Sequence, residues 1–180
     1  MSAPAVFLDR DGVLNAAVVV DGRPHPPADV SELAVLPGVE PACRRLAEAG
    51  LRLIVVTNQP DVARGTQSLG AVQAINDRLR AELGLDDVIV CPHDDADGCS
   101  CRKPRPGMLL RAAGEWGIDL AGSVMVGDRW RDIEAGRAAG ARTVFVDRHY
   151  DEPAPVDPDL IVNELEESVP WIIETTARRP

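Results

Sequence analysis

The chain has 180 residues, a formal net charge of −10 and a sequence pI near 4.7. Such an acidic surface opposes binding to a nucleic acid backbone or to an anionic membrane, so we expect neither partner. No apolar run approaches membrane-spanning length, and the N-terminus lacks the basic stretch and long apolar core of a signal peptide. The sequence therefore predicts a cytoplasmic monomer that forms a single domain over residues 1–180.

Short apolar runs rich in valine and isoleucine alternate with helical patterns along the chain. The expected strands are 5–8, 51–57, 87–91, 123–127 and 142–146, with a weaker one at 159–162. The expected helices are 39–50, 69–84, 107–117 and 130–140, and each closes on a glycine that can end it. This alternation predicts an α/β fold with a doubly wound, mostly parallel, Rossmann-like sheet covered by helices on both faces.

The connecting segments are short. The sequence VVVDGRP, residues 18–24, places Asp-Gly between two extended stretches and predicts a small hairpin. The proline-rich stretch 152–159 is expected to be a surface connection to a last short strand and helix. Too few residues separate the first strand from its helix to form a large cap domain, so short loops should set specificity. Ligands bind at the carboxyl ends of parallel strands, which directs attention to the residues after each run.

Acidic residues follow two of these runs. Asp9 and Asp11 come directly after the first strand and point the same way if the extended backbone persists, so they repel unless a cation lies between them. Asp128 ends a later run in the matching position, and Asp132 follows one helical turn later. Carboxylates are ligands that Mg²⁺ takes, with water and substrate phosphate completing the shell. We predict a magnesium site here, with Asp132 supporting it from behind.

The motifs FLDRDGVLN, VVTNQ, CRKP and GDRWRD, each after the expected element, resemble those of the haloacid dehalogenase superfamily of phosphatases. The resemblance implies that Asp9 attacks phosphorus to form an aspartyl-phosphate and that Asp11 acts as general acid and base. It also implies the remaining roles: Thr57 and Asn58 bind the phosphoryl oxygens, Lys103 neutralises charge, and Asp9, Asp128 and the backbone carbonyl of Asp11 hold Mg²⁺. A charged turn or an inactive relative is the alternative interpretation.

A cluster of soft metal ligands lies in one loop: Cys91, His93, Cys99 and Cys101. Three thiolates and one imidazole complete a tetrahedral set for structural Zn²⁺ and leave no position open for water. Disulfides are rare in a reducing compartment, so reduced cysteines that merely lie close together are the alternative. Cys43 belongs to the first expected helix, where burial as a small apolar residue is expected. A bound zinc ion would fix the conformation of this zinc-binding loop, which carries Arg102 and Lys103.

The zinc loop followed by CRKPRPGM resembles the branch that contains heptose bisphosphate and histidinol-phosphate phosphatases, and TNQPDVARG and PGMLL favour the former. The resemblance implies removal of the 7-phosphate of D-glycero-D-manno-heptose 1,7-bisphosphate, with Arg102 and Arg129 contacting this small phosphorylated metabolite. A local cation cluster should offset the acidic background: Arg64, Arg102, Lys103, Arg105 and Arg129. The chain departs from the family at AAVVVDGRPH and at Pro60-Asp61. Histidinol phosphate or another small ester, and a zinc-stabilised binding protein without catalysis, are the alternatives.

Overall fold

The computed structural model describes residues 2–177, and a six-stranded sheet in the order β5-β4-β1-β6-β7-β8 forms its centre. The strands are β1 (Ala5–Leu8), β4 (Arg52–Asn58), β5 (Asp87–Cys91), β6 (Val124–Gly127), β7 (Arg142–Val146) and β8 (Leu160–Val162). Every neighbouring pair in this sheet is parallel. The predicted strands, including the weaker last one, are confirmed.

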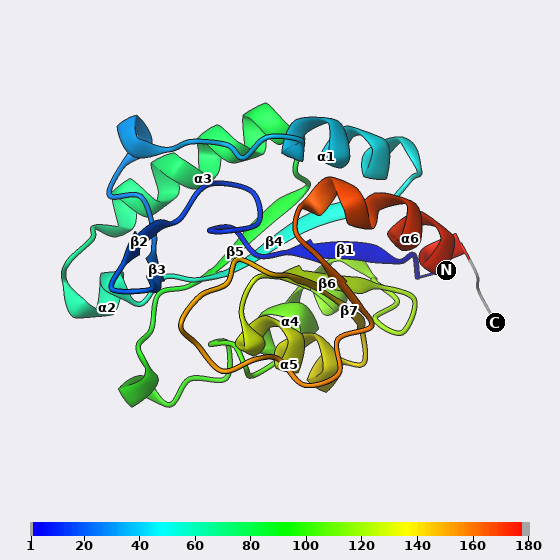
Figure 1. Ribbon diagram of the computed structural model, residues 1–180. Coiled ribbons are helices and arrows are strands. Elements are labelled where there is room, and N and C mark those ends of the chain that lie inside the picture. The colour runs from blue at the N-terminus through cyan, green and yellow to red at the C-terminus, as the bar shows by residue number, and fades with distance from the viewer. Residues whose placement is uncertain (1, 178–180) are drawn as a thin grey trace.

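Helices cover both faces of the sheet (Figure 1). The helices α1 (Val39–Glu48), α3 (Leu69–Leu83) and α6 (Leu165–Ala177) pack on one face, and α4 (Gly107–Trp116) and α5 (Trp130–Ala139) pack on the other. Val6 and Leu8 belong to the first of these two cores, and Phe7 belongs to the second, because successive side chains of a strand point to opposite faces. The predicted doubly wound α/β fold is therefore confirmed.

The strand order determines where a site can form. The chain leaves β1 for β4 and β5 on one side, then returns to place β6 on the other side of β1. The carboxyl ends of β4, β1 and β6 therefore lie side by side at the point where the order reverses, which is where ligands bind in such sheets. Asp9 and Asp128 follow the central strands directly, and Thr57 lies near the end of β4.

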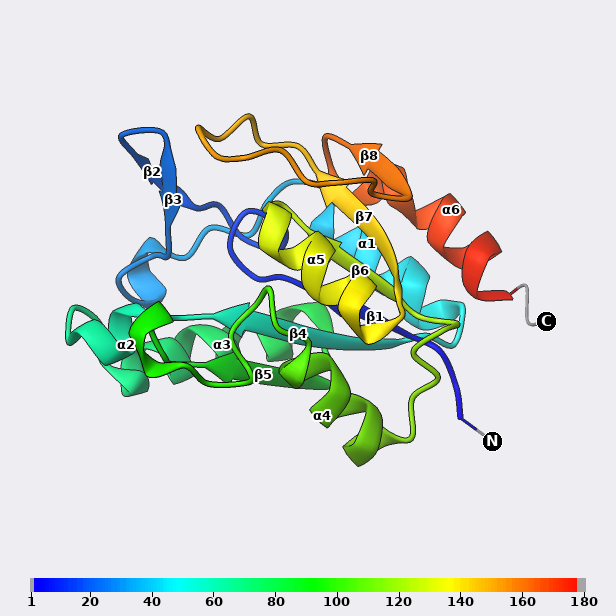
Figure 2. The ribbon, with the colours of Figure 1, turned by 90° about the horizontal axis from the view of Figure 1, so that it is seen from below.

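The connections add short elements but no large cap. Between β1 and α1 lie the antiparallel strands β2 (Val18–Val20) and β3 (Arg23–His25) and the 3₁₀ turn η1 (Val30–Glu32); elsewhere lie the short α2 (Asp61–Arg64) and η2 (Asp95–Asp97). The predicted hairpin is confirmed: Asp21 and Gly22 both have positive φ, as a tight Asp-Gly turn requires. The hairpin and the loop after β7 project from the same end of the molecule (Figure 2).

Among the described helices, none has the combination of length and hydropathy that crossing a bilayer requires.

Candidate active site

Three buried carboxylates meet where the strand order reverses. Asp9 follows β1, Asp128 follows β6, and Asp132 lies in the first turn of α5; each has a carboxylate oxygen within 4.8 Å of the others. Their residues are only 7 %, 2 % and 1 % exposed. Three negative charges so close together and so far from water require positive charge between or beside them.

Two glycines allow the backbone to approach these carboxylates. Gly12 has a φ of +82°, and a Cβ on it would lie 1.8 Å from Oδ2 of Asp128. A Cβ on Gly127 would lie 2.1 Å from the Cβ of Asp132. A side chain at either position would therefore displace an acidic group of the cluster.

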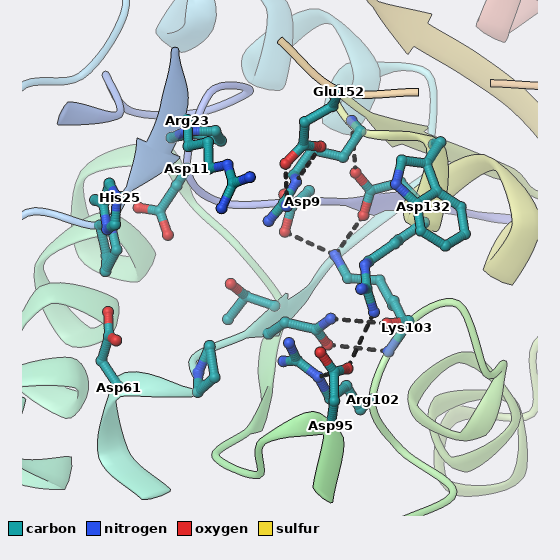
Figure 3. A pocket seen from close by; sticks show the side chains of 18 of the residues that line it. Asp9, Asp11, Arg23, His25, Asp61, Asp95, Arg102, Lys103, Asp132 and Glu152 are labelled. Atoms are coloured by element: carbon teal, nitrogen blue, oxygen red, sulfur yellow. Dashed lines mark hydrogen bonds and ion pairs between the residues drawn. The ribbon is translucent and has the colours of Figure 1, made fainter. Parts of the chain in front are cut away.

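Lys103 supplies one positive charge. Its Nζ lies 2.7 Å from Asp9 Oδ1 and 2.6 Å from Asp132 Oδ1, and it donates to the carbonyl oxygen of Val56 at 2.7 Å. Burial opposes the charged form, but the negative charges of Asp132 and Asp9 outweigh it and raise the pKa of Lys103. The amine therefore stays charged against the cluster (Figure 3).

One lysine does not balance three carboxylates. Burial raises the pKa of Asp9 to about 6, although the charge of Lys103 works against this rise. Burial, followed by the charges of Asp9 and Asp132, raises the pKa of Asp128 well above its ordinary value. The hydroxyl of Tyr150 lies beside the Asp128 carboxylate and lowers its pKa only in part, and neither oxygen has a well-formed hydrogen bond within the described residues. A hard divalent cation would satisfy these oxygens, so the residues fit a Mg²⁺ site.

Asp11 lies outside this cluster, contrary to the expectation that it points the same way as Asp9. The strand ends at Leu8 and the chain turns, with the N–H of Leu14 donating to the carbonyl of Arg10 at 2.8 Å. Three residues bind the Asp11 carboxylate: Arg10 through Nε and Nη2 at 3.2 and 3.0 Å, Asn15 at 2.9 Å and Gln59 at 2.8 Å. Its carboxylate faces the side of the cavity near His25 (Figure 3).

The network around Asp11 extends into the core. Arg10 is fully buried, and its Nη1 donates to Oδ1 of Asn76 on α3 at 3.0 Å. Gln59 is also fully buried and donates from Nε2 to the hydroxyl oxygen of Thr57 at 3.0 Å. Neither Arg10 nor Gln59 is among the predicted site residues, because nothing in the local sequence indicates their long-range partners.

Asn58 makes two contacts that the sequence did not predict. Its Nδ2 donates to the backbone carbonyl of Lys103, and its Oδ1 accepts from the backbone N–H of Lys103, both at 3.0 Å. The side chain therefore pairs with the loop that carries the lysine. One Nδ2 hydrogen remains for a phosphoryl oxygen, because an amide nitrogen has two.

A cavity of about 480 Å³ opens over these groups. It brings together all eight predicted substrate-binding residues: Asp9, Asp11, Thr57, Asn58, Arg64, Arg102, Lys103 and Arg129. Asp128 lies in the wall of a neighbouring cavity of about 260 Å³. Arg105, expected in the cation cluster, is not among the described residues that line the larger cavity; it donates instead to the backbone carbonyl of Cys99.

Three arginines that line the cavity are held by carboxylates. Nε of Arg64 lies 2.7 Å from Asp94, and Nε of Arg102 lies 2.7 Å from Asp95. Arg129 donates from Nε to Glu152 at 2.8 Å. These pairs fix the orientation of the guanidinium groups and reduce the positive potential that they present.

Residues 152–159 form the predicted connection to β8 and α6, and the start of this loop also takes part in the site. Glu152 and Pro153 line the larger cavity, and the hydroxyl of Tyr150 lies close to Gly12 beside Asp128. Burial, and then the charge of Asp128, raise the pKa of Tyr150. The signal was present in the sequence, because this loop follows the carboxyl end of a predicted strand.

The four predicted zinc ligands also converge. Sγ of Cys91 lies 3.6 Å from Nδ1 of His93, 3.7 Å from Sγ of Cys99 and 3.1 Å from Sγ of Cys101. Cys101 lies 3.3 Å from His93 and 3.4 Å from Cys99. Ligand atoms around tetrahedral zinc lie roughly 3.5–3.8 Å apart, so the group has nearly the required size. Cys43 is buried in α1, as predicted.

The comparisons with known proteins agree with this geometry. A family profile described as haloacid dehalogenase-like hydrolase matches residues 17–140. A D-glycero-beta-D-manno-heptose-1,7-bisphosphate 7-phosphatase of Pseudomonas aeruginosa is 39% identical over 153 residues, which are 81% of this chain and 82% of that protein. The enzyme of the same name from Escherichia coli K12 is 35% identical over 99% of this chain and 93% of its own length.

Solved structures give the same result. The D,D-heptose 1,7-bisphosphate phosphatase from B. bronchiseptica, complexed with magnesium and phosphate, has a TM-score of 0.78 and 32% identity, and the match covers 95% of this chain and 98% of that one. The motifs in the sequence, the fold, the profile and these relatives lead to one assignment. The chain belongs to the haloacid dehalogenase-like hydrolase family.

Proposed function

We propose that the protein is a magnesium-dependent phosphatase that removes the 7-phosphate of D-glycero-D-manno-heptose 1,7-bisphosphate through an aspartyl-phosphate on Asp9. One observation carries the chemistry: Asp9 lies against Lys103 and beside Asp128 and Asp132, so that three buried carboxylates share one lysine. The names of the relatives in Pseudomonas aeruginosa and Escherichia coli support the choice of substrate.

In this proposal Asp9, Asp128 and the backbone carbonyl of Asp11 hold Mg²⁺, and Asp132 supports them by binding Lys103. The bound ion neutralises phosphate oxygens so that a carboxylate anion can approach phosphorus. The magnesium and phosphate in the B. bronchiseptica structure support this assignment.

The two chemical steps follow from the residues around the cavity. An oxygen of Asp9 attacks phosphorus, the bond from phosphorus to the leaving oxygen breaks, and Asp11 gives that oxygen a proton. Water then attacks phosphorus, Asp11 accepts its proton, and the bond to Asp9 breaks to release phosphate. Four N–H groups hold the Asp11 carboxylate in place at the wall of the cavity, where it can exchange a proton with the leaving oxygen and with water.

The phosphoryl oxygens would be held by groups that already have one partner each. Thr57 accepts from Gln59, so its own hydroxyl hydrogen is free to point into the cavity. Asn58 has its second amide hydrogen, and Lys103 has its charge. Such fixed donors around the transferring group are the main requirement of phosphoryl transfer.

Zinc has a structural role in this proposal. Cys91, His93, Cys99 and Cys101 would bind one ion and hold the loop that delivers Lys103. Burial opposes ionisation of the Cys99 thiol, but the backbone N–H of Arg102 and the neighbouring thiols outweigh it and lower its pKa to about 7. That environment favours the thiolate, which is the form that binds zinc. The cytoplasmic, monomeric state expected from the sequence remains part of the proposal.

A substrate panel with Mg²⁺ tests the proposal. We expect the highest kcat/KM with heptose 1,7-bisphosphate, release of the 7-phosphate alone, and no turnover when the metal is chelated. A strong preference for histidinol phosphate would reject the substrate, and turnover without any divalent metal would reject the mechanism. Covalent labelling of Asp9 by phosphate in a rapid-quench experiment would test the intermediate directly.

A further inference from the structure

The basic side chains around the larger cavity differ in their partners. The paired ones each have a carboxylate within ion-pair distance, and they are Arg64, Arg102, Lys103, Arg129 and Arg131. Arg23 and His25 line the same cavity, and neither has an ion pair or a hydrogen bond from its side chain within the described residues. They are therefore the basic groups that a ligand reaches without displacing a carboxylate.

The hairpin that carries Arg23 is held in place. The N–H of Asp151 donates to the carbonyl of Gly22 at 3.1 Å, which attaches the turn to the loop after β7. At the other end, Nε2 of Gln67 donates to the carbonyls of Pro27 and Ala28 at 2.8 and 2.9 Å. The backbone of β3 is fixed at both ends, although the side chain of Arg23 is exposed.

Arg23 and His25 form one wall of the cavity. They are two residues apart in β3 and therefore project on the same side of the strand. Arg102 and Lys103 lie across the cavity from them (Figure 3). A substrate whose reacting phosphoryl group lies against Asp9 and Lys103, and which extends across the cavity from them, meets the hairpin wall.

An unpaired arginine in this position suits an anion. The guanidinium offers forked N–H donors that match the oxygens of a phosphate, and such charge-assisted bonds are about twice as strong as neutral ones. We propose that Arg23 binds the second phosphate of the substrate, at the end remote from the reacting phosphoryl group, and so selects bisphosphates over monophosphates. This inference rests on the proposed function, because it assumes that the reacting phosphate lies against Asp9.

The test compares Arg23→Gln and Arg23→Lys with the wild type on a sugar bisphosphate and on the same sugar without the second phosphate. The quantity measured is the ratio of the two kcat/KM values. Arg23→Gln should lower this ratio by about 10- to 100-fold, mainly through KM for the bisphosphate, and Arg23→Lys should retain part of it. The matched control is Arg111→Gln, an exposed arginine of α4 paired with Glu115, which should leave the ratio unchanged.

A ratio that stays the same in Arg23→Gln overturns the inference, and so does an equal loss on both substrates. Thermal unfolding of the variant excludes a folding defect as the cause. The proposed function is tested separately by the identity of the preferred ester. If the wild type prefers an ester other than heptose bisphosphate, the proposed substrate fails, whereas Arg23 is still judged by the ratio between the doubly and singly phosphorylated forms of a sugar.

Discussion

Replacing Asp9 by asparagine should abolish turnover and, in the absence of metal, stabilise the folded protein. Asparagine has nearly the same shape as a protonated aspartic acid but cannot ionise or attack phosphorus. Burial raises the pKa of the Asp9 carboxyl from 3.8 to about 6. At about 1.4 kcal/mol per pKa unit, ionising this carboxyl costs ~3 kcal/mol more in the folded protein than in the unfolded chain.

The direction with pH follows from this raised pKa. Below about pH 4 the carboxyl of Asp9 is protonated in both folded and unfolded chains, and the stabilising effect of the raised pKa is fully present. As pH rises toward 6, the unfolded chain releases this proton first, so the free energy of unfolding of the wild type falls. Above pH 6 the free energy of unfolding of the wild type has fallen by ~3 kcal/mol. The Asp9→Asn variant does not lose this stability, because asparagine does not ionise.

Urea unfolding, followed by the fluorescence of the three tryptophans, measures this difference. In EDTA at pH 8 we expect Asp9→Asn to exceed the wild type by up to ~3 kcal/mol, or roughly 6–12 °C in Tm, and at pH 4 the two should coincide. Mg²⁺ should stabilise the wild type more than the variant, because only the wild type keeps the full ligand set. Asp77→Asn, which removes an exposed carboxylate from α3, is the control. A variant that is less stable than the wild type at pH 8 without metal would refute the reasoning.

Three further changes test other contacts. Lys103→Met removes the cation that contacts Asp9, and kcat should fall by about 10²–10³-fold at saturating substrate; a loss confined to KM would contradict a role in the reaction. Asn76→Leu leaves Nη1 of the buried Arg10 without its acceptor and should lower the free energy of unfolding by ~1–3 kcal/mol in urea; unchanged stability would mean that Arg10 finds another partner. Cys99→Ser should lower Tm and reduce the zinc content, which we expect to be about one ion per chain in the wild type. A wild type that is zinc-free and fully active would contradict the proposed structural role of zinc.

The sheet and its helices were predictable because their signals are local. Valine-rich runs and the glycines after the helices depend only on neighbours in sequence, and Gly50, Gly84, Gly117 and Gly140 all follow helices with positive φ. The positions of Asp9 and Asp128 followed from the same pattern, since the carboxyl ends of adjacent parallel strands meet at one edge.

The orientations of site residues were not predictable in the same way. Asp11 turns from the direction of Asp9 because Arg10 binds it, and Arg10 in turn depends on Asn76, which lies 66 residues away. Asn58 pairs with the backbone of Lys103, 45 residues along the chain. Such contacts exist only after the fold has formed, so neither composition nor periodicity contains them.

The loop that carries the four proposed zinc ligands also carries charged residues of the site. It delivers Lys103 to the carboxylate cluster, and it supplies Asp94, the N-cap of η2, to Arg64 and Asp95 of η2 to Arg102. If all of them are ionised, the three carboxylates and one lysine carry a net charge of about −2, which one divalent cation balances. Because the other arginines of the cavity have acidic partners, we expect the net attraction for a phosphate to come mainly from the proposed metal ion, Lys103 and the unpaired Arg23. Loss of zinc should therefore weaken substrate binding by displacing Lys103, even though none of the four proposed zinc ligands is among the described residues that line the larger cavity.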